Sequence, residues 1–413
     1  MTDEVSPLQE ILQQAQQASP TLASAGSAQR DRAIAAMAEA MRATFDEILE
    51  ANTLDLETSR EMAVPELVLC WLKLTPERLE STVEILEHLA QASDPLQAWE
   101  ATPSLHATGN GRTYGQASPL GTLAFIYEAF ADLGAIAAAM CLKTGNSLVL
   151  RGGSETSHTN AAFERICQEA LSAAQLPATA IDYLADERSD SLQELVSSSN
   201  ELDLVLVHGR IGLVQKTLQL AAVPVLPLAM GNTCLYWSPD GDPTRVIDAI
   251  AESHVRDPDA VNAIEKVLVH TSVSPTAIGQ VFSALQEAEF ELRGDAALVA
   301  QYPDWLQPAA PDEWRCPYAE RIVAFRVTDG PDSARTWIQN CVGSHATTMV
   351  CQSYEGSRQF AASSPSPLTY INTSPRFHHY YPHNGAIYLG VGRWEGPIDC
   401  ARLTRRCQVV EGS

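Results

Sequence analysis

Four consecutive residues, Gly152-Gly153-Ser154-Glu155, follow the apolar run 147–150 and could bind part of a nucleotide. Two glycines leave backbone N–H groups unhindered, and phosphate and ribose groups bind at the carboxyl ends of buried parallel strands. The longer pattern GxGxxG is missing, so an ordinary turn also explains the glycines. Ser154 and Glu155 are the candidate ribose ligands.

Three histidines, His378, His379 and His383, surround Tyr380 and Tyr381 and raise the question of a metal site. Neighbouring imidazoles can share an ion, but no carboxylate or thiol stands nearby at ligand spacing. Aromatic-rich loops also pack at surfaces and subunit contacts, and we favour that interpretation. We therefore predict no metal.

The elements around the glycine turn have the pattern of a βαβ unit over residues 119–160. An apolar run is followed by an Ala-rich segment of helical period, a turn at Thr144-Gly145-Asn146, and a second β-rich run. This unit predicts a parallel sheet that would present the turn at 152–155 at its carboxyl edge.

Helices and strands alternate along the rest of the chain. Apolar residues three and four apart predict a helix over 27–52, and Thr75-Pro76 predicts the start of a helix that runs to about Ala90. The later pattern predicts an α/β protein with mostly parallel sheets. Beyond residue 160 the predicted helices are 161–176, 212–222, 246–252 and 274–288, and the predicted strands are 202–207, 223–226, 266–270, 322–327 and 368–372.

The composition limits the partners. A net charge of −24 argues against nucleic acid and against an anionic membrane surface, since both require clustered Lys and Arg. No apolar run of about 18 residues lacks a charge, so we expect no membrane span. The acidic start MTDEV lacks a signal pattern, and the nine scattered cysteines contain no CxxC pair. We expect a cytoplasmic protein of two or three domains with reduced thiols.

Several motifs occur in the order found in γ-glutamyl phosphate reductases, and from about residue 10 to 410 the chain resembles that family. It is the proline-biosynthetic branch of the aldehyde dehydrogenase superfamily. The motifs are LKLTPER from residue 72, PLG from 119, IYEA from 126, LKTGN from 142, LVLRGGSE from 148, NA at 262 with EKVLVH from 265, and INxSxRF from 371.

The resemblance implies an aldehyde-dehydrogenase-like α/β fold. A Rossmann-type cofactor domain would span 1–105 and 119–230, a catalytic-type domain 231–395, and a small oligomerisation element 106–118 and 396–413. In that element a hairpin at 106–117 would pair with the carboxyl-terminal tail, so we expect a homo-oligomer, with a protein partner as a further option. The cofactor implied is NADP(H), and its candidate ligands are Lys143, Arg151, Gly152, Gly153, Ser154, Glu155, Gly209 and Gly212.

In active members the resemblance implies that NADPH reduces L-glutamyl 5-phosphate to glutamate 5-semialdehyde through a cysteine thioester and a thiohemiacetal. A thiolate suits this chemistry because it accepts the acyl group and leaves again. The family's P-x-A-C-N-A loop appears here as PDAVNA, with Val261 in place of the nucleophile and Asn262 beside it. Cys234 is the alternative thiol that we consider, although a small buried residue is its simpler interpretation.

Other matched positions also differ. The family's Y-E-A-R-P-N segment has Phe130 in place of the arginine and Asp132 in place of the asparagine, and Asp132 would repel a phosphorylated substrate. Tyr388 stands where an acid is expected, and residues 376–382 replace the substrate loop.

Two principal hypotheses follow. In the first, which we favour from the sequence, the chain has lost the reductase activity and serves a binding, regulatory or scaffolding role. In the second, it is an active NADP-dependent glutamate-5-semialdehyde dehydrogenase with a relocated nucleophile, or one that acts without covalent catalysis. A third is a partner subunit of an active paralogue or of a glutamate kinase.

Overall fold

A computed structural model describes residues 6–101, 112–184, 191–255, 261–341 and 345–411. The chain folds into two compact units. Unit 1 comprises Met1–Pro227, His379–Leu389 and Ile398–Ser413, and unit 2 comprises Leu228–His378 and Gly390–Pro397. Among the described residues, no helix combines the length and the apolar character needed to cross a membrane.

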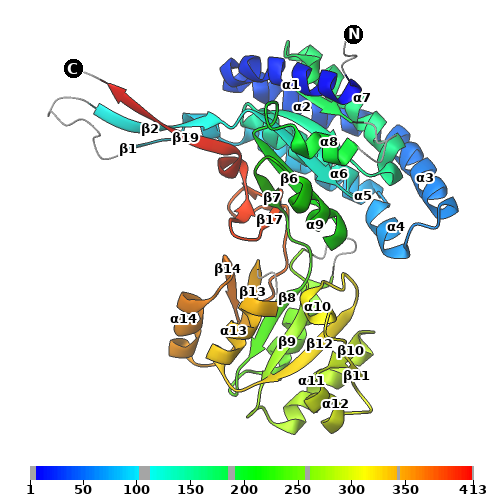
Figure 1. Ribbon diagram of the computed structural model, residues 1–413, viewed down its shortest axis with the longest axis vertical. Helices are drawn as coiled ribbons and strands as arrows, with labels where there is room; N and C mark the ends of the chain where they lie inside the picture. The colour runs from blue at the N-terminus through cyan, green and yellow to red at the C-terminus, as the bar shows by residue number, and fades with distance from the viewer. Residues whose placement is uncertain (1–5, 102–111, 185–190, 256–260, 342–344, 412–413) are drawn as a thin grey trace. The chain divides into compact units, whose positions relative to one another are not determined.

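Five helices build the amino-terminal part of unit 1, shown in blue in Figure 1: α1 (Pro7–Ser24), α2 (Ser27–Ala43), α3 (Phe45–Glu61), α4 (Glu66–Leu72) and α5 (Pro76–Gln91). The single helix expected over 27–52 is wrong, because the chain leaves helical geometry at Thr44, whose φ is −118°. The Thr44 hydroxyl donates to the Ala40 carbonyl at 2.8 Å, and such local bonding weakens a helix interior. The predicted start of α5 is confirmed, since Thr75 Oγ1 accepts from the Arg78 N–H at 3.2 Å.

A five-stranded parallel sheet forms the core of unit 1, with the strand order β5-β4-β3-β6-β7. Its strands are β3 (Thr122–Tyr127), β4 (Ser147–Arg151), β5 (Ile181–Tyr183), β6 (Leu204–His208) and β7 (Val225–Pro227). The intervening helices are α6 (Ala131–Lys143), α7 (Ser157–Ala173), α8 (Ser191–Ser197) and α9 (Ile211–Leu220). The predicted βαβ unit is confirmed.

The two faces of this sheet are covered by different helices. One face carries an apolar cluster with α1 and α8, to which Leu213 and Val214 of α9 add. On the other face, Tyr127 donates a hydrogen bond to Asn160 of α7 at 2.7 Å, and Gly134 of α6 lies beside the same tyrosine. The chain therefore changes faces at the neighbouring strands β3 and β6, the place where doubly wound sheets bind ligands at their carboxyl ends.

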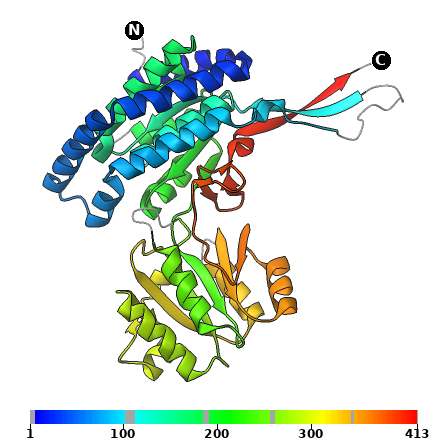
Figure 2. The ribbon, with the colours of Figure 1, turned by 180° about the vertical axis from the view of Figure 1, so that it is seen from behind.

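A separate three-stranded antiparallel sheet contains β1 (Trp99–Ala101), β2 (Arg112–Pro119) and β19 (Thr404–Glu411). Eight residue pairs join β2 to β19, so the carboxyl-terminal tail pairs with this segment as the resemblance implies. Figures 1 and 2 show the two strands side by side, extending away from the helices of unit 1. The expected hairpin turn at 109–111 lies outside the described residues.

Unit 2 is built on a seven-stranded parallel sheet, ordered β11-β10-β12-β9-β8-β13-β14. Its strands are β8 (Thr233–Trp237), β9 (Ile264–His270), β10 (Glu291–Gly294), β11 (Gln307–Pro308), β12 (Ile322–Thr328), β13 (Ala346–Val350) and β14 (Leu368–Ile371). Its helices are α10 (Pro243–Ser253), α11 (Pro275–Glu287), α12 (Ala296–Gln301), α13 (Pro331–Cys341) and α14 (Tyr354–Ser363).

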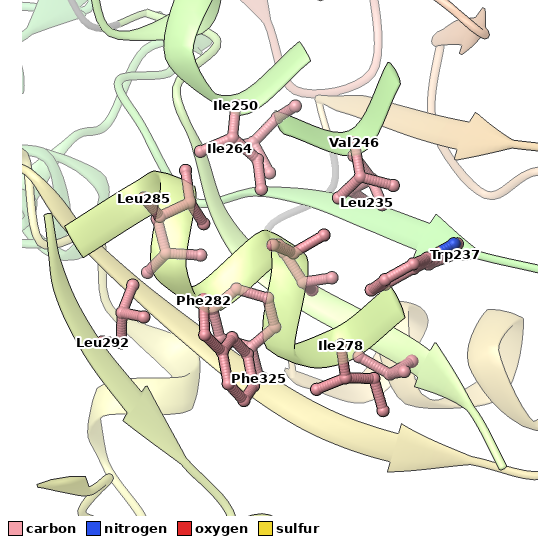
Figure 3. Close-up of a cluster of buried hydrophobic side chains, with 14 of the residues drawn as sticks. Leu235, Trp237, Val246, Ile250, Ile264, Ile278, Phe282, Leu285, Leu292 and Phe325 are labelled. Atoms are coloured by element: carbon pink, nitrogen blue, oxygen red, sulfur yellow. The ribbon is translucent and has the colours of Figure 1, made fainter. Parts of the chain in front are cut away.

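Apolar clusters fill both faces of this sheet. On one face, Phe282 of α11 packs edge-on against Phe325 of β12 with 4.9 Å between ring centroids, within the cluster drawn in Figure 3. On the other face, Cys234, Leu268 and Met349 pack with residues of α13 and α14. The α/β class predicted for this part of the chain is confirmed.

One segment belongs to a different unit from the one expected. We predict a domain over 231–395, but His379–Leu389 belongs to unit 1. Tyr380 stacks on His88 of α5 with ring centroids 4.3 Å apart, and this contact ties the segment to unit 1. A contact between rings so far apart in the chain leaves no local sequence pattern.

A half-buried pair of carboxyl groups, Glu164 of α7 and Asp182 of β5, gives a pH prediction. Burial, followed by the nearby Asp182, raises the pKa of Glu164 to about 7, while the Gln168 amide stabilises its charged form. Because this pKa exceeds the unfolded value of about 4.3, stability decreases as pH rises from about 5 to 8. We expect Glu164→Gln to raise stability at pH 8 relative to pH 5, by less than about 1 kcal/mol because solvent screens the pair.

Urea unfolding at both pH values measures this difference. Glu169→Gln, an exposed position on the same helix, is the matched control and should change neither midpoint. A Glu164→Gln effect equal at both pH values would contradict the assignment of the titration to Glu164.

Candidate functional site

Val261 lies where the segments leading into neighbouring strands of unit 2 meet. β12, β9, β8 and β13 are adjacent and parallel, so their amino-terminal ends share one edge of the sheet, which we call the amino edge. The Val261 carbonyl accepts from the Gly231 N–H at 2.9 Å, and His345 Nε2 lies 2.9 Å from the same oxygen. The buried Val261 side chain offers no nucleophilic atom at the position matched to the family's cysteine.

Two asparagines at the amino edge have unsatisfied polar atoms. Asn262 is 2% exposed, and neither its Oδ1 nor its Nδ2 has a hydrogen-bond partner. Asn232, immediately before β8, has a buried Oδ1 without a partner and a left-handed backbone with φ of 59°. Buried amides are normally paired, and strained backbone is frequent at functional sites, so this edge has the properties of a ligand site.

Glu265 connects three segments of the amino edge. Its buried carboxylate accepts backbone N–H bonds from Asn232 at 2.8 Å, Tyr318 at 2.8 Å and Ala319 at 2.7 Å. Burial raises its pKa, whereas the neighbouring Lys266 and these three donors act in the opposite direction. The carboxylate therefore fixes the segment before β12 against the segment before β8.

Lys266 is buried beside this carboxylate. Its Nζ lies 3.9 Å from Glu265 Oε2 and 3.5 Å from the centroid of the Tyr318 ring, and it has no hydrogen-bond partner. Burial lowers its pKa to about 8, while Glu265 raises it. A lysine of this kind can switch between charged and neutral forms near neutral pH.

Cys234, the thiol weighed as a substitute nucleophile, lies in the apolar cluster between the sheet and helices α13 and α14. It is 0% exposed, so no substrate reaches its sulfur without opening the core. Cys351 lies in the same cluster. Cys316 differs from both, because it is exposed and lies two residues before Tyr318, whose N–H donates to Glu265 at the amino edge.

In unit 1, most of the predicted cofactor residues lie at the carboxyl edge of the five-stranded sheet. A Cβ on Gly152 would come within 2.2 Å of Asn160, and one on Gly153 within 2.1 Å of the Glu155 carboxylate. Glu155 accepts from the Ala129 N–H at 2.8 Å, and burial raises its pKa. Arg151 ends β4 and is buried, and Ser154 follows the glycines.

The α9 amino terminus adds two more predicted residues. Gly209 has φ of 151°, and a Cβ there would lie 2.9 Å from Glu128. Gly212 has open space around it in the first turn of α9. Glu128 accepts from the Arg210 N–H and from its Nε, both at 2.9 Å, so this pair bridges β3 and β6 at their carboxyl ends.

Lys143 does not belong to this group. It ends α6 before β4 begins, and its Nζ donates to Asp31 Oδ1 at 2.7 Å and to the Ala92 carbonyl at 2.5 Å. The ammonium is 1% exposed and joins α6 to α2. We therefore remove Lys143 from the cofactor candidates, because its hydrogen bonds are structural.

The altered segment at 130–132 also differs from expectation. Asp132 forms a bidentate ion pair with Arg78, at 2.5 Å for each of its two contacts. Phe130 is 4% exposed and stacks on Trp71 with ring centroids 5.4 Å apart. The expected repulsion of an anionic substrate by Asp132 is therefore offset by an internal cation.

The histidine segment forms part of a small two-stranded ribbon, β15 (Tyr380–Tyr381) and β16 (Ala386–Ile387). His379 Nδ1 lies 2.9 Å from the Tyr388 carbonyl, and Tyr381 packs against Tyr388. Within the described ranges, no three His, Cys, Asp or Glu side chains come together as metal ligands. Tyr388 thus serves an aromatic contact where the resemblance expects an acid.

Sequence reasoning missed Glu265, Lys266, Glu128, Arg78 and Asn232 as site residues. One signal was available, because Glu265 and Lys266 interrupt an otherwise apolar strand and a charged pair inside a buried strand requires partners. Glu128, Arg78 and Asn232 contact residues from distant segments of the chain, and such contacts leave no local sequence signal.

Comparisons with known proteins agree with this architecture. A sequence profile described as the aldehyde dehydrogenase family matches residues 3–296. The chain is 44% identical to "Gamma-glutamyl phosphate reductase 2" of Synechocystis sp., covering 99% of this chain and 98% of that one. It is 31% identical to a γ-glutamyl phosphate reductase of Lactiplantibacillus plantarum, covering 98% of each.

Among solved structures, the γ-glutamyl phosphate reductase of Thermotoga maritima superimposes with a TM-score of 0.89 at 26% identity, covering 99% of both chains. A lactaldehyde dehydrogenase of Escherichia coli has a TM-score of 0.72 at 16% identity, which shows the shared fold alone. The chain therefore belongs to the aldehyde dehydrogenase family, and within it to the γ-glutamyl phosphate reductases.

Proposed function

We propose that this protein is an NADP(H)-dependent reductase that interconverts L-glutamyl 5-phosphate and glutamate 5-semialdehyde. The main support is full-length similarity to γ-glutamyl phosphate reductases, one of them 44% identical, together with unpaired amides at the amino edge. This differs from the loss of activity that the sequence favours, because Val261 removes one thiol and leaves the surrounding frame in place. The nucleophile is then supplied from another position.

The carboxyl edge of unit 1 fits a dinucleotide. Open space at Gly212 and the first-turn N–H groups of α9 suit a pyrophosphate, and Glu155 suits a ribose hydroxyl that carries no phosphate in NADP(H). Gly152, Gly153 and Gly209 pack too closely for a Cβ, which keeps the backbone of these turns in place. When bound, NADPH supplies a hydride. Arg210 is already paired with Glu128, so phosphate binding here relies on backbone donors.

A second candidate is a non-catalytic binding or scaffolding role, and the specific observation that favours it is Val261. A valine cannot form the thioester, and Phe130 and Tyr388 replace polar groups of the family's site. In this case the protein would assemble as a homo-oligomer and would bind a nucleotide or a protein partner without catalysing a reaction.

One assay separates the two. The purified protein is incubated with glutamate 5-semialdehyde, NADP⁺ and inorganic phosphate, and NADPH is followed by absorbance. The proposed reductase produces NADPH above a heat-inactivated sample, with dependence on phosphate because phosphate is a substrate in this direction. A flat trace, combined with NADPH binding measured by fluorescence, would support the binding role.

Val261→Cys tests whether position 261 alone limits the reaction. We expect turnover to remain within about twofold of the wild-type rate, because the side chain at position 261 is 2% exposed and the proposed reductase already has its nucleophile at another position. Val261→Ala is the control for packing. A rise of about tenfold or more in Val261→Cys would show that the remaining site was already complete.

A further inference from the structure

We propose that Cys316 is the thiol that forms the acyl-enzyme in place of a nucleophile at position 261. This inference rests on the proposed reductase function and names a residue for it. The step requires a reachable sulfur close to position 261, a nearby cation and a donor for the carbonyl oxygen. The amino edge of unit 2 contains side chains that could supply each of them.

The position of Cys316 follows from packing between its neighbour and the turn before β8. A Cβ on Gly231 would lie 3.2 Å from Pro317 Cβ, and the Gly231 N–H donates to the Val261 carbonyl at 2.9 Å. Pro317, Gly231 and Val261 are therefore consecutive neighbours in space. Cys316 is one residue from the first of them and is exposed.

The Cys316 segment is held firmly. Tyr318 and Ala319 both donate backbone hydrogen bonds to the Glu265 carboxylate, at 2.8 and 2.7 Å, and the same carboxylate accepts from Asn232. The Tyr318 hydroxyl also donates to Glu313 at 2.9 Å. A nucleophile needs such positioning, because small displacements cost large factors in rate.

Lys266 supplies a cation beneath this segment. Its Nζ faces the Tyr318 ring at 3.5 Å, has no hydrogen-bond partner, and belongs to a side chain that is 0% exposed. A negative charge on Cys316 favours the protonated form of this lysine. A cation at this place would stabilise negative charge that develops at the amino edge during acyl transfer.

Asn262 is the candidate donor for the carbonyl oxygen. Its carboxamide is 2% exposed, and both its polar atoms lack a partner, although buried amides are normally satisfied. Asn262 directly follows Val261, so its orphaned group belongs to the same edge as the Cys316 segment. A substrate carbonyl would satisfy Nδ2.

The proposed reaction at Cys316 consists of acyl transfer to the thiolate followed by reduction, with NADPH as the reductant. The Cys316 thiolate attacks the acyl carbon, a C–S bond forms, and the C–O bond to phosphate breaks with the electron pair leaving on phosphate, which takes a proton from solvent. When bound, NADPH would supply the hydride that reduces the thioester carbon and would itself be oxidised to NADP⁺. The resulting thiohemiacetal collapses to the aldehyde and releases the thiolate.

Cys316→Ser and Cys316→Ala test the proposal, with Cys70→Ser as the matched control because Cys70 is an exposed thiol on α4 of unit 1. In the semialdehyde assay we expect both Cys316 variants to lose about a hundredfold or more in kcat, while Cys70→Ser retains the wild-type rate. Circular dichroism and urea midpoints equal to those of wild type confirm that the variants fold. Activity within about twofold of wild type in folded Cys316→Ser would overturn the proposal.

A second readout does not depend on turnover. Acetyl phosphate serves as a small acyl-phosphate probe, and peptide mass spectrometry locates the acetyl group. We expect acetylation at Cys316 in wild type and none at that site in Cys316→Ser. If wild type shows no NADPH formation but Cys316 is acetylated, the proposed function fails and the assignment of the thiol stands. An inactive wild type with no acetyl group on Cys316 overturns both.

Discussion

Glu265→Ala is expected to lower the free energy of unfolding of unit 2 by about 3 to 5 kcal/mol, because it breaks a buried charge pair. The carboxylate accepts three backbone N–H bonds, and each buried N–H left without an acceptor is costly. Lys266 would also lose its only carboxylate within 4 Å among the described residues. Urea unfolding followed by tryptophan fluorescence measures the change.

The control for this substitution is Glu252→Ala, an exposed position on α10 of the same unit, which should stay within about 0.5 kcal/mol of wild type. The double variant Glu265→Ala with Lys266→Met should recover part of the loss, since no unpaired charge then remains buried. A Glu265→Ala midpoint equal to that of wild type would mean that the segment before β12 does not need this carboxylate.

The fold could be predicted where local chemistry decides the structure. Thr75 and Pro76 define the start of α5, and the βαβ unit around α6 follows from apolar periodicity and a glycine turn. β8 and β13 were missed because both are buried on both faces, yet Thr347 and Thr348 make β13 look polar. Central strands can contain threonines when the neighbouring strands accept and donate all of their backbone hydrogen bonds.

The candidate site was predicted less well than the fold. The valine at position 261 is visible in the loop motif, whereas the pairing of Lys143 with Asp31 joins residues 112 positions apart and removes a cofactor candidate. Glu265 accepts three backbone hydrogen bonds from two segments that come together only in the folded sheet. Long-range hydrogen bonds of this kind leave no periodic pattern. The sequence therefore reveals which positions differ from the family, but it does not reveal which residues contact them in the folded protein.

The largest effect in unit 1 is expected from Arg78→Ala, which should lower the free energy of unfolding by about 3 kcal/mol. The guanidinium forms two hydrogen bonds with Asp132 and donates to the carbonyls of Trp71 and Lys73 at 2.8 and 3.0 Å. The Arg78 side chain is 16% exposed and that of Asp132 13%, so little water can reach these groups to replace the hydrogen bonds that the variant loses. Chemical unfolding monitored by circular dichroism measures the loss.

Asp132→Asn distinguishes a structural role from a substrate role. It restores the family's residue and keeps one acceptor for Arg78, so we expect a loss of about 1 to 2 kcal/mol and an unchanged KM for the semialdehyde. The KM should not change because Phe130, buried against Trp71, still occupies the place of the family's arginine. A clearly lower KM in Asp132→Asn would show that the Asp132 charge repels the substrate despite its pairing with Arg78.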